Sequence, residues 1–90
     1  MAIVVKFAVI GMSSEKYEAA LSRLEAEGAG APPGRLYHVS YGSRDNVQVI
    51  DVFESPQAFE AFGRTLVPIL QGMGIQAEPD VYSVYKIIEG

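Results

Sequence analysis

Apolar residues follow two different spacings along the first third of the chain, and each spacing predicts one secondary-structure element. Ala2 to Gly11 is a run of mostly β-branched and small apolar residues, which is typical of a strand. A helix is predicted to begin at Ser13 or Ser14, because a serine hydroxyl caps a first turn well, and to stop at Gly28. Its apolar residues recur at helical spacing on one stripe, namely Tyr17, Ala20, Leu21 and Leu24.

After a glycine- and proline-rich loop from Gly28 to Gly34, the pattern changes to that of a hairpin. Arg35 to Tyr41 and Val47 to Glu54 are predicted strands, and the intervening Gly42 to Asn46 has turn chemistry.

Ser55 and Pro56 mark the start of a second helix, with serine at the cap and proline in the first turn. Pro68 lies inside this helix and is expected to kink it, and Gly72 and Gly74 are expected to end it. Its apolar stripe comprises Phe59, Phe62, Leu66, Ile69, Leu70 and Met73. A final strand is predicted over Val81 to Ile88, after a break at Pro79 and Asp80.

The resulting order, β-α-β-β-α-β, predicts a ferredoxin-like α+β fold. Right-handed crossovers around the hairpin give a four-stranded antiparallel sheet with both helices on one face. Ninety residues leave room for one hydrophobic core, so residues 1–90 are expected to form a single domain.

The first predicted strand is apolar on both faces, with Lys6 as the exception. An antiparallel sheet with one solvated face should instead alternate apolar and polar residues. The chain has no cysteine and is too short to build a large core, so a partner subunit is the expected source of extra burial. We therefore expect a homodimer that packs two sheets face to face into one barrel.

At this level the chain resembles the dimeric α/β-barrel superfamily, in particular small members related to antibiotic-biosynthesis monooxygenases. The resemblance covers the element order of the whole chain. Its most suggestive local sequence runs from Val49 to Ser55 and continues with Ala58 to Phe62, a strand ending in an aromatic and an acid before a helix with paired aromatics. That superfamily includes cofactor-independent oxygenases, isomerases, haem-handling enzymes and members without established activity, so the resemblance implies a fold more sharply than a reaction.

Charge and composition exclude several functions. The net charge is −4 and the seven basic residues are scattered, which argues against nucleic-acid binding. The longest apolar stretch is too short to span a bilayer and lacks the flanks of a signal peptide, so the expectation is a cytoplasmic protein with no membrane role. One histidine excludes a multi-histidine metal site within one chain, and the lack of cysteine excludes thiolate ligands. His38 as a haem ligand would have no second ligand beside it. We therefore expect no cofactor.

The register of the predicted hairpin determines which polar residues share a face of the sheet. Any even-length loop, such as a two-residue turn at Arg44 and Asp45, puts His38, Ser40 and Asp51 on the same face, with His38 opposite Asp51 in the simplest register. Because the helix-covered face should be the more apolar one, we assign Tyr37, Val39, Tyr41, Ile50 and Val52 to the helices. His38, Ser40, Val49, Asp51 and Phe53 would then face the barrel interior, together with Lys6.

Within such a barrel, His38 and Asp51 are the candidate catalytic residues. A carboxylate beside an imidazole fixes its tautomer and raises its basicity, so His38 could remove a proton from a phenolic or enolic substrate. Lys6 or a tyrosine hydroxyl would stabilise the oxyanion. The candidate substrate-binding residues are Lys6, Ser40, Phe53 and Tyr82. The sequence does not determine which face of the sheet the alternate residues of the last strand occupy, so Tyr82 could point to either face.

These residues suggest a small-molecule-binding protein that acts on an aromatic or enolic molecule as a cofactor-independent monooxygenase or an isomerase. The alternative is a non-catalytic ligand-binding or accessory protein of the same fold, in which His38 and Asp51 are only a cross-strand structural pair. Lys6, His38 and Asp51 should converge on a cavity if the first interpretation holds. A barrel filled by side chains, or a His38 that faced the helices, would contradict that site.

Overall fold

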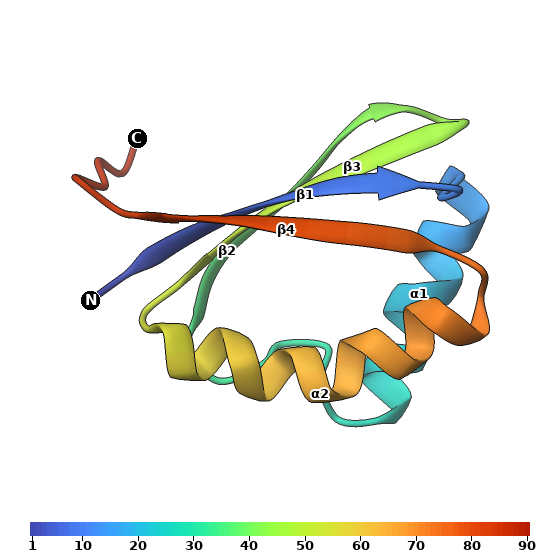
Figure 1. The fold of residues 1–90 in the computed structure, drawn as a ribbon, viewed down its shortest axis with the longest axis horizontal. Helices are drawn as coiled ribbons and strands as arrows, with labels where there is room; N and C mark the ends of the chain where they lie inside the picture. The colour runs from blue at the N-terminus through green and yellow to red at the C-terminus, as the bar shows by residue number, and fades with distance from the viewer.

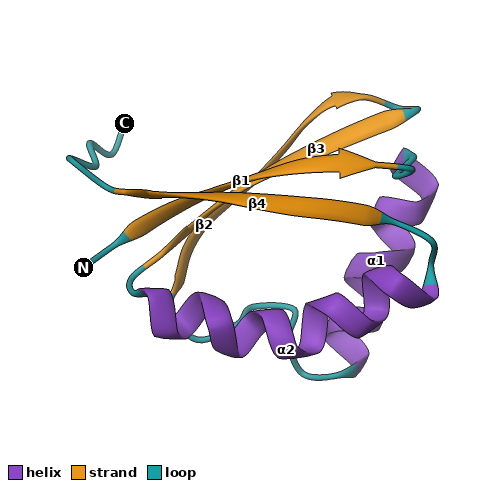
Figure 2. Ribbon diagram, viewed as in Figure 1, coloured by secondary structure: helices purple, strands orange, loops and turns teal.

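A computed structural model of residues 1–90 has the predicted β-α-β-β-α-β order and the ferredoxin-like fold. One sheet lies on one side of the molecule and both helices lie on the other (Figures 1 and 2). The elements are β1 (Ile3–Ile10), α1 (Ser14–Ala26), β2 (Arg35–Ser43), β3 (Asn46–Phe53), α2 (Pro56–Gly72) and β4 (Gln76–Ser83).

Both helices begin at the serine caps that the sequence predicts. The Ser13 hydroxyl accepts a hydrogen bond from the backbone N–H of Lys16, and the Ser55 hydroxyl accepts one from Ala58. Each bond satisfies a donor that the helix itself leaves unpaired. Helix α2 continues through Pro68 as far as Gly72. Neither helix has the length and hydropathy needed to span a membrane.

The sheet is antiparallel with the strand order β2-β3-β1-β4. Strands β2 and β3 form a hairpin in which Ser43 pairs with Asn46, so the turn consists of Arg44 and Asp45. This even-length turn confirms the predicted register, in which His38 lies opposite Asp51.

The last strand lies earlier in the sequence than predicted. Strand β4 covers Gln76–Ser83 rather than Val81 to Ile88, so Pro79 and Asp80 lie inside it. The reason is that β4 is an edge strand paired with β1 alone, and a proline without an N–H is tolerated where no second neighbour needs that donor. Residues 84–90 have no regular structure and run along the side of the sheet away from the helices (Figure 1), where Glu89 accepts a hydrogen bond from the Tyr37 hydroxyl.

The hydrophobic core lies between the sheet and the helices. Alternate residues of β1 and β3 point into it and are buried, and Leu24 of α1 and Phe62 of α2 pack against them from the helix layer. The buried strand residues are Ile3, Val5, Phe7, Val9, Val47, Val49 and Phe53.

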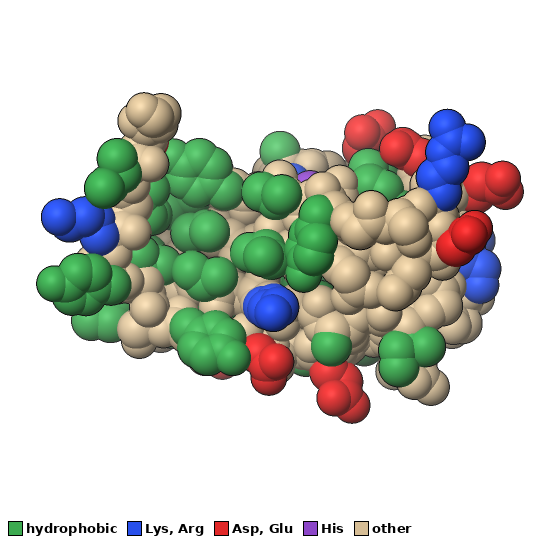
Figure 3. Space-filling view, turned by 90° about the horizontal axis from the view of Figure 1, so that it is seen from above, with side chains coloured by type: hydrophobic (Ala, Val, Ile, Leu, Met, Phe, Trp, Pro, Cys, Tyr) green, Lys and Arg blue, Asp and Glu red, His purple; other side chains and the backbone are tan.

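The opposite face of the sheet is also rich in apolar side chains, as the view from above shows (Figure 3). By strand alternation, Val39, Tyr41 and Tyr82 belong to this open face, and all three are exposed. The structure therefore has the second apolar face that the sequence of β1 suggests.

Candidate functional site

The candidate catalytic pair lies on the helix-covered face of the sheet, opposite to the predicted side. Asp51 shares its face of β3 with the buried Val47, Val49 and Phe53, and it is only 2% exposed. Its neighbour His38 points the same way because the two residues are directly paired. The assignment of His38, Ser40, Val49, Asp51 and Phe53 to the barrel interior is therefore wrong. The residues assigned to the helices, such as Val39, lie on the open face.

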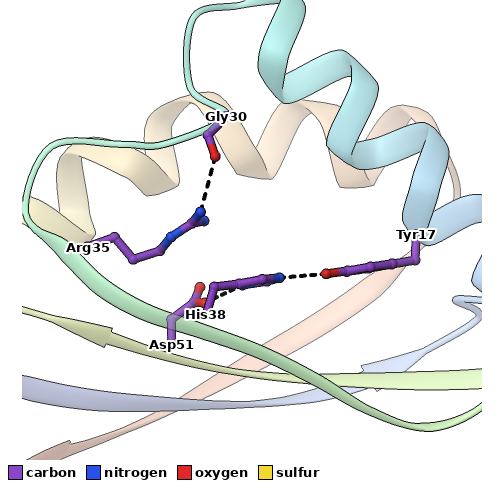
Figure 4. Close-up of polar contacts among 5 residues, drawn as sticks. All are labelled: Tyr17, Gly30, Arg35, His38 and Asp51. Atoms are coloured by element: carbon purple, nitrogen blue, oxygen red, sulfur yellow. Dashed lines mark hydrogen bonds and ion pairs between the residues drawn. The ribbon is translucent and has the colours of Figure 1, made fainter. Parts of the chain in front are cut away.

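Three side chains form a continuous hydrogen-bonded chain in the core. The His38 Nδ1 atom lies 2.5 Å from Asp51 Oδ1, and His38 Nε2 lies 2.7 Å from the Tyr17 hydroxyl (Figure 4). Tyr17 is in the first turns of α1, His38 is on β2 and Asp51 is on β3. The chain thus links the helix layer to the middle of the sheet.

The rings of Tyr17 and His38 are almost parallel, with an interplanar angle of 3° and centroids 6.0 Å apart. Since a hydrogen bond joins the ends of the two rings, they meet end to end rather than face to face (Figure 4). This arrangement directs the phenol oxygen at the in-plane lone pair of the imidazole, which is the favourable geometry for proton transfer.

The buried carboxylate determines how the chain is polarised. An ionised Asp51 only accepts hydrogen bonds, so Nδ1 of His38 carries the proton that is donated to it. Nε2 of a neutral imidazole is then left as the acceptor for the Tyr17 O–H. A base at Nε2 that is held in one tautomer by a carboxylate is the arrangement that general-base catalysis uses.

This chain borders a cavity of about 60 Å³ between the sheet and the two helices. Of the sixteen residues that line the cavity, thirteen are hydrophobic, including Tyr17, and the other three are Arg35, His38 and Asp51. The polar atoms in its wall therefore belong to the hydrogen-bonded chain and to one arginine. An apolar cavity with a few convergent polar groups is the usual form of a small-molecule site.

Arg35, the first residue of β2, is held by two contacts. Its Nη2 atom donates to the Gly30 carbonyl at 3.1 Å, and its guanidinium lies over the Phe62 ring, 5.8 Å from the centroid. Figure 4 shows its side chain pointing inward from the side of the His38–Asp51 pair opposite to Tyr17. The two contacts fix the position of a positive charge in the cavity wall.

The predicted substrate-binding residues do not line this cavity. Lys6 and Tyr82 belong to the open face, so Lys6 cannot act together with His38 in one site. Ser40 is exposed on β2, and Phe53 is fully buried against Phe59 and Phe62 in the core.

The structure adds Tyr17 and Arg35 to the site. Tyr17 is the only residue of the predicted helix stripe with a polar group at its end, so a stripe that faces the sheet carries one hydroxyl into the core. The sequence therefore contained an indication that Tyr17 belongs to the site. It contained no such indication for Arg35, because an arginine at the start of a strand is usually solvated.

No group of three or more histidine, cysteine, aspartate or glutamate side chains is arranged to hold a metal ion.

Comparison with known proteins identifies the fold. No protein-family model and no curated protein matches the chain. Among solved structures, SnoaB, a cofactor-independent oxygenase from Streptomyces nogalater, is 22% identical with a TM-score of 0.62, over 99% of this chain and 96% of that one. A candidate antibiotic biosynthesis monooxygenase from Chloroflexus aurantiacus is 18% identical with a TM-score of 0.63, over 97% of each chain.

A conserved protein from Methanosarcina mazei is 14% identical and has a TM-score of 0.63, over 91% of each chain. At these identities the similarity demonstrates a shared fold. The resemblance to proteins of the antibiotic-biosynthesis monooxygenase type is thus confirmed at the level of the fold.

Proposed function

We propose that this protein binds a small, largely apolar phenol or enol between its sheet and helices and removes a proton from it. The observation that carries the proposal is the Tyr17–His38–Asp51 chain at the wall of an apolar cavity. The fold shared with a cofactor-independent oxygenase supports the same type of chemistry.

In this mechanism the ligand hydroxyl approaches the Tyr17 oxygen from the cavity. The proton of Tyr17 passes to Nε2 of His38 while the ligand proton passes to the Tyr17 oxygen, so the tyrosine is regenerated and the imidazole becomes positively charged. Asp51 stabilises this imidazolium through its short hydrogen bond to Nδ1. A low-polarity wall strengthens that interaction because little water competes for it.

The resulting ligand anion has two possible fates. A deprotonated carbon that still bears one hydrogen can form a C–O bond with dioxygen; loss of that hydrogen and cleavage of the O–O bond then leave a carbonyl on the ligand and release the second oxygen atom as water. Return of the proton to a different carbon would give an isomer instead. Proton removal is common to both reactions and is the step assigned to these residues.

The size of the cavity limits the ligand. A volume of about 60 Å³ holds a few water molecules. Pockets for larger ligands measure roughly 300 Å³ or more. A ligand with even one ring therefore requires the cavity walls to move outward, which favours small ligands over polycyclic ones.

The test is to measure dioxygen uptake and product formation with a panel of small phenols and enols. Tyr17→Phe and His38→Gln are expected to lower the catalytic rate by about 100-fold or more, since each interrupts the proton path. Tyr41→Phe is the matched control, because it removes a hydroxyl from the open face and should leave the rate unchanged. Equal rates for wild type and His38→Gln would exclude His38 as the base.

A second candidate function is ligand binding without turnover. It is favoured by one observation: every buried polar side-chain atom already has a hydrogen-bond partner, so the chain of three residues is satisfied without a substrate. Panel compounds that bind to the wild type but are recovered unchanged would support this alternative.

We further propose that a second copy of this chain covers the open face of the sheet. Val39 is 53% exposed there among other apolar residues, and an apolar face of this extent is typical of an interface. Sedimentation should show a dimer that Val39→Glu weakens. Val67→Glu is the matched control, because Val67 is similarly exposed (49%) but lies on α2. A monomeric wild type would contradict the proposal.

A further inference from the structure

Arg35 is a cation in the cavity wall that has no acidic partner. It is partly buried, it lines the cavity, and it forms no ion pair with any carboxylate of the chain. The one hydrogen bond of its side chain goes to a neutral carbonyl, that of Gly30. The guanidinium therefore retains donors that are free to meet a ligand.

The charges of Arg35, Asp51 and His38 indicate at which stage of the reaction a negatively charged ligand fits the cavity. Before proton transfer, Asp51 has a hydrogen bond to a neutral His38 and Arg35 has no carboxylate within ion-pair distance, so neither charge has an oppositely charged partner. After it, Asp51 is compensated by the imidazolium, which leaves the charge of Arg35 to be matched by the ligand anion. The arrangement is thus fully paired only when the ligand is bound as its conjugate base.

The positions of the two groups restrict the ligand further. Tyr17 and Arg35 approach from opposite sides of the His38–Asp51 pair (Figure 4). The ligand therefore loses its proton at the end near Tyr17, and the positive charge of Arg35 lies near its other end. An anion whose charge stayed on the deprotonated oxygen would not reach Arg35. A conjugated anion would, because its charge spreads to the far end.

We infer that the site is built for conjugated acids, meaning phenols or enols with an electron-accepting group such as a carbonyl at the far end, and that Arg35 holds the negative charge there. The ligand O–H bond breaks, its proton enters the Tyr17–His38 path, and the electron pair stays on the ligand and shifts toward the acceptor at Arg35. This inference rests on the proposed proton removal by His38. It gives Arg35 the oxyanion-stabilising role that the sequence had suggested for Lys6.

The probe for this inference is 4-nitrophenol, which has one ring, an acidic hydroxyl and a conjugated acceptor opposite to it. Its phenolate absorbs visible light and the neutral phenol does not, so absorbance reports the ionisation of the bound probe directly. At fixed pH, the ratio of phenolate to phenol in the probe bound to wild type should exceed the free ratio by about tenfold. Arg35→Met should remove most of that increase, and Arg35→Lys, which keeps the charge but lacks the planar fork, should retain part of it.

The variants separate this inference from the proposed function. If His38→Gln abolishes the increase but Arg35→Met and Arg35→Lys do not alter it, proton removal stands and the role of Arg35 is refuted. If only the arginine variants reduce the increase, Arg35 holds the anion but His38 is not the base. A bound probe that is no more ionised than the free one refutes both.

Conjugation is tested with 3-nitrophenol, whose nitro group cannot accept the phenolate charge by resonance. The Arg35→Met substitution should change the ionisation of bound 3-nitrophenol less than that of 4-nitrophenol, and an equal change would refute the proposed ligand class. Circular dichroism and the thermal unfolding midpoint establish that each variant is folded, and Arg35→Lys keeps the test decisive if Arg35→Met is not.

Discussion

Replacing His38 with leucine tests whether the buried hydrogen-bonded chain is a coupled unit. The substitution keeps an apolar side chain of similar length in the core but leaves the Asp51 carboxylate without its partner. The side chain of Asp51 is 3% exposed and that of His38 is 22% exposed, so water cannot readily replace the lost bond to the carboxylate. Asp51→Leu makes the complementary change, and the double variant removes both polar groups.

The three variants should differ in a definite order. Removing one partner of a buried pair costs about 3–5 kcal/mol, and the partial exposure of His38 places His38→Leu near 3 kcal/mol. Asp51→Leu loses a charge-assisted hydrogen bond but leaves only a neutral imidazole unpaired, which costs about 2 kcal/mol. In the double variant the Tyr17 hydroxyl, which also loses its partner in His38→Leu, is the only group of the chain left unpaired, so the double variant should lie within about 2 kcal/mol of wild type. The predicted coupling between the two sites is therefore at least about 3 kcal/mol.

The assay is urea unfolding followed by circular dichroism, at one protomer concentration for all variants because dimerisation would add to stability. A control cycle combines Asp51→Leu with Ser40→Leu, a substitution on β2, the strand that carries His38. The exposed Ser40 forms no side-chain hydrogen bond with Tyr17, His38 or Asp51, so these effects should add. A coupling between His38 and Asp51 below about 0.5 kcal/mol would refute the claim that the pair is one electrostatic unit.

Three further predictions follow from other contacts. The hydrogen bond to Glu89, with smaller contributions from desolvation and from the charge of that carboxylate, raises the pKa of Tyr37 above its usual value of 10.0. The Tyr37–Glu89 pair therefore stabilises the fold below pH 10.0, and this contribution is lost as the pH rises through the raised pKa. The difference between ultraviolet titrations of wild type and Tyr37→Phe should show the raised pKa of Tyr37. Glu89→Gln should lower the midpoint of the Tyr37 titration. Gln48 donates to and accepts from the backbone of Val9, so Gln48→Ala should lower the free energy of unfolding by about 1–2 kcal/mol, and an unchanged urea midpoint would contradict this. Phe53→Ala should lower it by about 3–5 kcal/mol, because a fully buried ring leaves a cavity; a loss below about 1 kcal/mol would show that the core collapses around it.

Most of the fold could be predicted from the sequence because local rules determine it. Serine caps begin both helices, and the hairpin register follows from the parity of its turn, which holds whichever even-length turn forms. The last strand was misplaced because Pro79 was interpreted as a break, and nothing local reveals that β4 has a neighbour on one side only. Edge position is a property of the complete sheet, so it becomes visible only after the strands are ordered.

The prediction of the sheet face on which His38 lies was wrong for a related reason. Counting apolar residues distinguishes the two faces of a sheet only when one of them is solvated, and here both are apolar, with Tyr37, Val39 and Tyr41 on the open face. The criterion that does decide is hydrogen-bond complementarity: a buried His–Asp pair needs a further partner for Nε2, and the helix stripe supplies one in Tyr17. The same open-face residues that reversed the assignment are the strongest reason to expect a second subunit there. Because the cavity beside His38 lies on the helix side of the sheet, a second subunit on the open face would not close it.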